Sequence, residues 1–150
     1  MSSFKHSILS ACKQVIHYKI TLLSDALSEL AESANVESKS SAGDKHETGR
    51  AMVHLEQEKL GKQLQEWENQ NILISKIDAA KQGDSIGLGS LIETNRGFFF
   101  MASNLGKLMI DEREIICISL QSPLGEQFTK CKEGDKFEFN KVGYQIIKLS

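Results

Sequence analysis

Two carboxylate side chains that could act together stand at Asp44 and Glu47, directly after Gly43. Residues three positions apart share one face of a helix, and carboxylate oxygens are ligands that Mg²⁺ accepts. The same spacing fits a capping box, in which Asp44 accepts a hydrogen bond from a backbone N–H group and Glu47 reaches back to the helix start. Acidic residues also suit the positive end of a helix dipole. The residues alone therefore leave a functional acid pair and a helix cap both open.

Histidine and cysteine residues give no pattern typical of a resident metal. His46 lies beside the acid pair, but the other histidines are not spaced to complete a site with it; they are His6, His17 and His54. Cys12, Cys117 and Cys131 are odd in number and scattered, without a C-x-x-C pair, which argues against a disulfide framework and a zinc site and favours reducing cytoplasm. The stretch before Cys12 is too short and polar for a lipoprotein signal, so we expect Cys12 on a helix face. We predict no metal in the isolated protein and a cytoplasmic location.

The bulk composition is that of an ordinary folded chain. Its 150 residues suit one domain or two small ones, and 25% are charged while 40% are hydrophobic. The net charge of −2 gives no basic excess to attract nucleic acid from a distance. Contact with DNA or RNA would therefore be local or delivered by a partner. No apolar run approaches the roughly 20 residues of a membrane span, so we expect no membrane partner.

Hydrophobic periodicity predicts a first helix from about Ser3 to Ala34. Its apolar residues form two adjacent stripes, typical of a coiled-coil seam that drifts around the helix. The first stripe is Phe4, Ile8, Ala11, Val15, Tyr18 and Leu22, and the second is Ile16, Ile20, Leu23, Leu27, Leu30 and Ala34. The polar, serine-rich stretch Asn35–Gly43 is then expected to be a connecting loop.

A second helix is predicted from Asp44 to about Ala80. It has a seam at heptad-compatible spacing formed by Val53, Leu60, Leu64, Trp67 and Ile74. Two helices of similar length with a short polar connection favour an antiparallel hairpin. We therefore expect an α-helical coiled-coil hairpin over residues 1–80, with its tip at about 35–48.

Residues 81–150 show strand-like patterning and are expected to form a small β-domain, which makes the chain α+β. The predicted strands are Ser85–Thr94, Gly97–Ser103, Lys107–Ile110, Glu114–Leu120, Lys136–Asn140 and Tyr144–Leu149. Ser122-Pro123 is typical of an N-cap followed by proline at the first helical position, so a short helix is expected up to about Cys131.

The segment from Ser122 to Asp135, SPLGEQFTKCKEGD, resembles the C-terminal signature of the bacterial Gre-type transcription elongation (transcript cleavage) factors GreA and GreB. In that family an S-P-L-G turn opens a short helix, which a G-D turn follows before two last strands. The resemblance covers essentially the whole chain and implies an FKBP-like antiparallel β-domain after the hairpin. It implies a mainly structural role for Ser122, Pro123, Leu124 and Gly125.

The resemblance also gives the tip a role. Gre factors carry D-x-x-E after a glycine at the hairpin tip, matched by Asp44 and Glu47, and an E-Q pair matched by Glu56-Gln57. It implies insertion of the tip into the secondary channel of RNA polymerase, where the acids help hold Mg²⁺ shared with the polymerase active site and stimulate cleavage of the nascent RNA 3′ end. Lys45 and Arg50 become candidates for contacts with RNA or polymerase. The chain would be a monomer and not an enzyme by itself.

Three alternative functions come into question, because the tip departs from the Gre pattern and because the expected fold occurs in proteins with other activities. The tip continues as Thr48-Gly49-Arg50-Ala51 and is less acidic than the family pattern, which favours a channel-binding modulator or inhibitor that does not promote cleavage. An FKBP-like domain would also fit a prolyl isomerase or chaperone, which needs an aromatic-lined pocket. A condensing enzyme of fatty-acid synthesis is excluded by the short length and by the absence of a Cys–His partner pattern.

Overall fold

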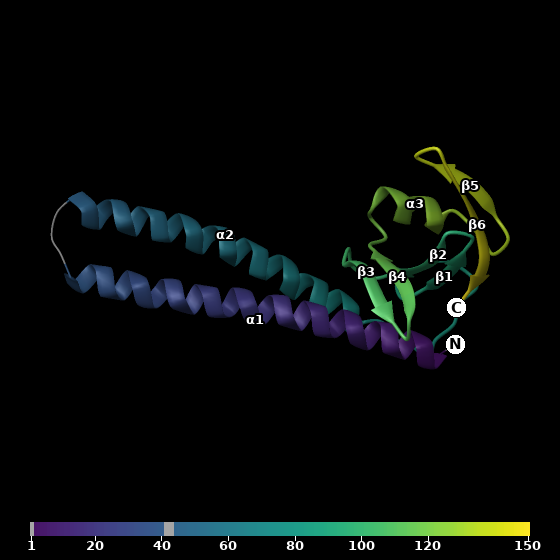
Figure 1. Ribbon diagram of the computed structural model, residues 1–150, viewed down its shortest axis with the longest axis horizontal. Coiled ribbons are helices and arrows are strands. Elements are labelled where there is room, and N and C mark those ends of the chain that lie inside the picture. The colour runs from purple at the N-terminus through teal and green to yellow at the C-terminus, as the bar shows by residue number, and fades with distance from the viewer. Residues whose placement is uncertain (1, 41–43) are drawn as a thin grey trace. The chain divides into compact units, whose positions relative to one another are not determined.

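The computed structural model describes the backbone of residues 2–40 and 44–150 and the side chains of residues 3–33 and 49–150. Two helices come first, and six strands with one short helix follow (Figure 1). In chain order the elements are α1 (Ser2–Ser40), α2 (Asp44–Ser75), β1 (Leu91–Thr94), β2 (Gly97–Met101), β3 (Gly106–Ile110), β4 (Arg113–Ile118), α3 (Pro123–Thr129), β5 (Lys136–Phe139) and β6 (Val142–Leu149). The predicted α+β class is confirmed. In the part of the chain described, no helix is long and apolar enough to cross a membrane.

The chain divides into two compact units. One unit joins Met1–Val15 to Ile72–Ser150, and the other is Ile16–Asn71. The start of α1 and the end of α2 thus belong with the sheet, because their apolar side chains supply part of its core. We call the first the sheet unit and the second the hairpin unit.

In the hairpin unit, α1 and α2 run antiparallel (Figure 1). Each helix has one half-buried stripe: Ile20, Leu23, Leu27 and Leu30 on α1, and Val53, Leu60, Leu64 and Trp67 on α2. Tyr18 and Leu22, from the other predicted stripe of α1, are 61% and 47% exposed. Each helix therefore partly buries one apolar stripe and leaves its other faces exposed, as expected for a two-helix hairpin.

Two predicted helix ends are wrong. The α1 helix continues to Ser40, so the loop predicted over Asn35–Gly43 does not begin at Asn35; residues 41–43 lie outside the described part. Nothing in 35–40 is glycine or proline, and serine or asparagine disfavours a helix by only a few tenths of a kcal/mol. The α2 helix ends at Ser75 instead of Ala80. There the Ser75 hydroxyl donates to Ile72 O at 2.6 Å, and Asp78 Oδ1 accepts from Ala80 N–H at 3.0 Å.

The six strands form one sheet in the order β3-β4-β2-β1-β6-β5. All neighbours are antiparallel except β2 and β4, which pair parallel with Phe99 opposite Ile116. The expectation of an antiparallel sheet thus holds for four of the five strand pairings among the described residues. The strand predicted over Ser85–Thr94 is wrong before Leu91: Ser90 Oγ accepts from Gly87 N–H at 2.9 Å and closes a loop.

Apolar side chains cover both faces of the sheet. On one face Phe99 lies 5.0 Å from Phe128 of α3, ring centroid to ring centroid, within a cluster that includes Ile92, Met101 and Ile146. On the other face Phe98 meets Phe4 of α1 edge-on at 5.8 Å, and the Arg113 guanidinium lies 4.8 Å from the Phe4 ring centroid. The first turns of α1 are thereby fixed to the sheet by aromatic and cation–π contacts.

Candidate functional site

The predicted acid pair belongs to the first turn of α2, because that helix begins at Asp44. The side chains of Asp44, Lys45 and Glu47 lie outside the described residues, so the acid-pair and helix-cap interpretations both remain predictions. Arg50 follows on the same helix with an exposed side chain. Further along α2, Glu56 is exposed and Gln57 is half-buried.

The Ser122–Gly125 segment forms the sharp connection from β4 into α3. Ser122 Oγ accepts from Gly125 N–H at 3.1 Å and donates to Ser119 O at 2.7 Å, so one hydroxyl serves both sides of the turn. Pro123 occupies the first turn, as predicted, where its missing N–H costs nothing. A Cβ atom at Gly125 would collide with the Ser119 carbonyl oxygen, so the position requires glycine.

The Leu124 side chain of the same segment packs against the core. It is half-buried and packs on the cluster around Phe128, which is fully buried. The S-P-L-G residues therefore connect a capped turn to the aromatic core, and the hydroxyl of Ser122, the polar side chain of this segment, is engaged in the turn.

Two further aromatic rings, Phe137 of β5 and Tyr144 of β6, extend this core. Phe128 meets Phe137 at right angles with centroids 5.3 Å apart, and Phe137 stacks on Tyr144 at 5.2 Å. Phe137 and Tyr144 also form part of the wall of an open depression of about 460 Å³, together with Asn95, Arg96, Lys136, Gly143 and Gln145. The rings are mainly engaged with one another, as a core requires.

Sequence reasoning treated the cysteines as scattered, but the fold brings two of them together. Cys12 and Cys117 are both free thiols with no exposed surface, and their Sγ atoms lie 3.6 Å apart. The hydrogen bond shared with Cys12 raises the pKa of Cys117, and burial acts in the same direction. Cys12 lies on a helix, as expected. Across the described residues, no group of three or more His, Cys, Asp or Glu side chains is placed to hold a metal ion.

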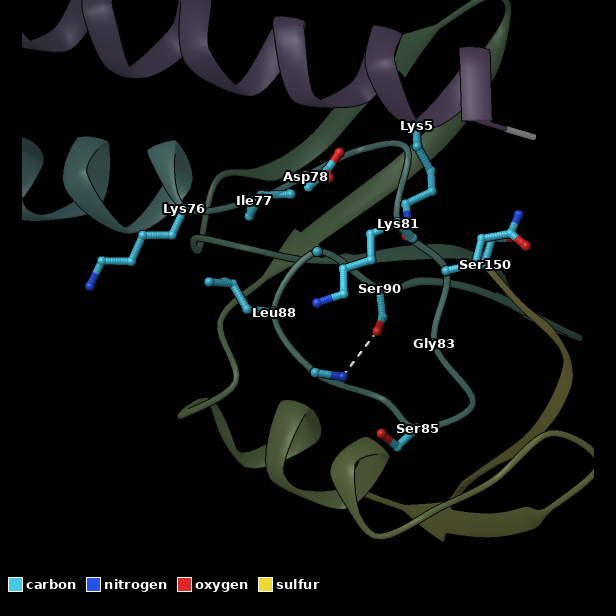
Figure 2. A pocket seen from close by; sticks show the side chains of 13 residues that line it. Lys5, Lys76, Ile77, Asp78, Lys81, Gly83, Ser85, Leu88, Ser90 and Ser150 are labelled. Carbon is cyan, nitrogen blue, oxygen red and sulfur yellow. Dashed lines mark hydrogen bonds between the residues drawn. The ribbon is translucent and has the colours of Figure 1, made fainter.

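A second feature missed by sequence reasoning is a cavity of about 390 Å³ inside the sheet unit. The start of α1, the segment after α2 and the 85–90 loop line it, and three of its lining residues are lysines (Figure 2). We call it the lysine cavity; its lining includes Lys5, Lys76, Asp78, Lys81, Ser85 and Ser90. The glycines of the 87–89 stretch gave only a weak signal for such a site, because no strand–loop–helix pattern surrounds them.

Lys5 is the unusual member of the lysine cavity. Only 2% of the residue is exposed, and its Nζ donates to Lys81 O at 2.9 Å. Burial lowers the pKa of Lys5, while the negative charge of Asp78 acts against that change.

Comparison with known proteins leaves the function to be argued from these residues. No protein-family model matches the chain, and no curated protein matches it. One solved structure, described as that of the transcription factor Gfh1, is 16% identical in sequence. The alignment covers 91% of this chain and 92% of that chain, with a TM-score of 0.36.

Proposed function

We propose that this chain is a Gre-like transcription elongation factor that binds RNA polymerase. The observation that supports this most is the Ser122–Asp135 segment. Its residues match the Gre signature, and its first four form a capped, glycine-dependent turn into α3, followed by β5 and β6. So specific a run of residues, at the place in the fold where that family has it, favours Gre factors over other small α+β proteins.

The helical hairpin supplies the reach that such a function needs. With 32 residues and a rise of 1.5 Å per residue, α2 is about 48 Å long. Asp44 begins α2 and α1 ends at Ser40, so the predicted acids belong to the end of the hairpin. A pair of helices with acids at its end is narrow enough to enter a channel that a globular domain cannot.

In this proposal Asp44 and Glu47 act inside the secondary channel of the polymerase. Their carboxylates help to hold a Mg²⁺ ion beside one that the polymerase already binds, and the two ions activate water against the RNA phosphodiester. The chain is then not an enzyme by itself, because the metal site and the RNA belong to its partner. Lys45 and Arg50 would contact RNA phosphates or the polymerase. The site of action is the cytoplasm, and contact with nucleic acid occurs through the polymerase.

Arg50 favours a second version, a channel-binding modulator that does not promote cleavage. Its side chain is exposed on α2, close to the acids in sequence. A fixed positive charge near two carboxylates competes with Mg²⁺ for them. Such a protein would occupy the channel and slow the polymerase.

Transcript cleavage in halted elongation complexes distinguishes these versions. The full chain, Asp44→Ala/Glu47→Ala and the control Glu66→Ala are each added to backtracked complexes, and polymerase binding is measured in parallel. We expect cleavage by the full chain and by the control, and loss of cleavage with retained binding for the double variant. Binding without cleavage by the full chain would leave the modulator, and absence of binding would refute both.

The open depression beside Phe137 and Tyr144 favours one candidate of another class, a prolyl isomerase or chaperone. Two aromatic side chains on its wall could contact a proline ring. Isomerisation of a proline-containing test peptide, with Tyr144→Ala as the comparison, measures this activity directly. A rate equal to that of the uncatalysed reaction would exclude it.

A further inference from the structure

The lysine cavity contains a buried cation, Lys5, whose charge Asp78 compensates only in part, because the effect of burial on its pKa is larger. An ammonium group has three N–H donors, and the contact found for Lys5 Nζ is the one to the carbonyl of Lys81. Within 4.0 Å the described residues form the ion pair Lys107–Glu114, and none of the described carboxylates comes that close to Lys5. A buried charge without a counterion is costly. An anion in the cavity would provide that counterion.

A second cation, Lys81, lies at the same cavity. Figure 2 shows its side chain extending across the 85–90 loop toward Ser90, while Lys76 points away from the cavity and Asp78 points toward α1. No ion pair holds Lys81 among the residues that the structure describes. Lys5 and Lys81 therefore put two positive charges at one cavity, and Asp78, the acidic side chain of its lining, offsets the charge of Lys5 only in part.

The backbone of the 87–89 stretch cannot be the main binding element. Gly87 N–H donates to Ser90 Oγ at 2.9 Å, and Gly89 N–H donates to Met101 O at 2.7 Å. These donors are already used within the loop and to β2. A ligand would thus be held by the two ammonium groups, with Ser85 as an additional hydroxyl on the wall.

We propose that the lysine cavity binds the phosphate group of a small phosphorylated molecule, held by the ammonium groups of Lys5 and Lys81. A phosphate dianion matches the two cations that line the cavity in charge. The volume of about 390 Å³ is in the range of small-molecule pockets and leaves room for an organic part beside the phosphate. All of its lining residues belong to the sheet unit, so phosphate binding can be measured on the chain alone, without polymerase.

Phosphate binding is measured on the full chain by isothermal titration with inorganic phosphate, with sodium chloride keeping the ionic strength constant. The variants are Lys81→Met, Lys5→Met and the control Lys148→Met, which replaces an exposed lysine of β6. Lys81→Met keeps the carbonyl that Lys5 uses, so it removes the charge without disturbing that hydrogen bond. We expect saturable binding that weakens about tenfold or more in both cavity variants, as loss of a charged hydrogen bond implies, and is unchanged in the control.

The organic part is tested with adenosine monophosphate and the charge preference with acetate. Tighter binding of the nucleotide than of phosphate, lost in Lys81→Met, would support the proposal and assign the remaining volume to the nucleoside. Equal binding of both would support a site for the phosphate alone. The proposal is overturned if phosphate gives no more heat than chloride, if acetate binds and phosphate does not, or if Lys81→Met binds like the unmodified chain. Should Lys5→Met fail to fold, Lys81→Met decides the result.

Discussion

The Sγ atoms of Cys12 on α1 and Cys117 on β4 lie 3.6 Å apart, although 105 positions separate the two residues in the chain. The contact joins the first helix to the sheet at a point with no exposed surface. The aromatic contact of Phe4 with Phe98 joins the same helix to the sheet within the same unit. The N-terminal turns of α1 therefore form part of the core of the sheet unit, and their removal should unfold that unit.

Removal of either thiol is predicted to destabilise the sheet unit. Cys12→Ala or Cys117→Ala should lower the free energy of unfolding by about 1–3 kcal/mol, because each leaves a small cavity and an unmatched thiol. The double variant should lose less than the sum, with a coupling of at least about 0.5 kcal/mol. Urea denaturation measures all three. Cys131→Ala is the control, since that residue is only half-buried, and losses that add strictly would contradict the contact.

The order of cysteine alkylation is a second prediction. Cys131 is half-buried, whereas Cys12 and Cys117 have no exposed surface, and Cys117 has a raised pKa, so its reactive thiolate is scarce. A thiol reagent should label Cys131 first in the folded chain and the other two only on unfolding. Mass spectrometry of digested samples gives the order. Labelling of Cys117 at the rate of Cys131 would show that the core opens readily.

Two glycine-to-alanine changes should act with opposite sign. Gly125→Ala is expected to cost about 1–3 kcal/mol, because the added Cβ meets the Ser119 carbonyl oxygen. Gly61→Ala in α2 has open space around the added atom and should stabilise its helix by up to about 1 kcal/mol. Thermal unfolding followed by circular dichroism measures both. Equal effects at the two positions would mean that the turn before α3 can relax.

Loss of the α3 cap should be milder than the change at Gly125. Ser122→Ala removes the acceptor of Gly125 N–H and should cost about 0.5–2 kcal/mol. Ser122→Thr keeps a hydroxyl that can accept from Gly125 N–H and donate to Ser119 O, and it should recover most of that loss in the same unfolding experiment. A variant with alanine that unfolds like the unmodified chain would mean that Pro123 alone fixes the turn.

The sequence predicted what local chemistry determines. Ser122 and Pro123 are recognisable because cap and first-turn preferences depend on neighbouring backbone groups only, and the seams of α1 and α2 follow from a repeat along one helix. The β1–β2 hairpin likewise has its turn at Asn95 and Arg96, immediately before Gly97. These features need no knowledge of distant residues.

Features that depend on distant residues were missed. The parallel pairing of β2 with β4 and the approach of Cys12 to Cys117 are set by packing of the whole unit, which no local pattern encodes. The α2 helix was predicted too long because Ile77 and Ala79 continue its apolar pattern, whereas both are buried beyond the helix end. The burial of Lys5 could not be read from a polar residue in an amphipathic helix. The roles of Asp44 and Glu47 remain predictions from the sequence alone.

Lys5 should make stability depend on pH in alkaline solution. Burial lowers its pKa in the folded chain below the ordinary 10.5, while the unfolded chain keeps the ordinary value. Between the two values the unfolded chain binds more protons, so the free energy of unfolding rises with pH, by at most about 1.4 kcal/mol per pH unit for one proton. Below the lowered value both states carry the charge, and the cost of burying it is fully present.

Lys5→Met removes this dependence and isolates it. Urea denaturation of the unmodified chain and of Lys5→Met, in chloride without phosphate, gives the free energy of unfolding from about pH 8 to about pH 11. The value for the unmodified chain minus that for the variant should rise toward pH 10.5 and then level off. Lys148→Met should show no such rise relative to the unmodified chain. A difference that stays flat or falls with pH would mean that Lys5 keeps its charge as easily in the folded chain as in the unfolded one. Groups of the protein itself would then compensate that charge, and the argument that the cavity needs an anion would fail.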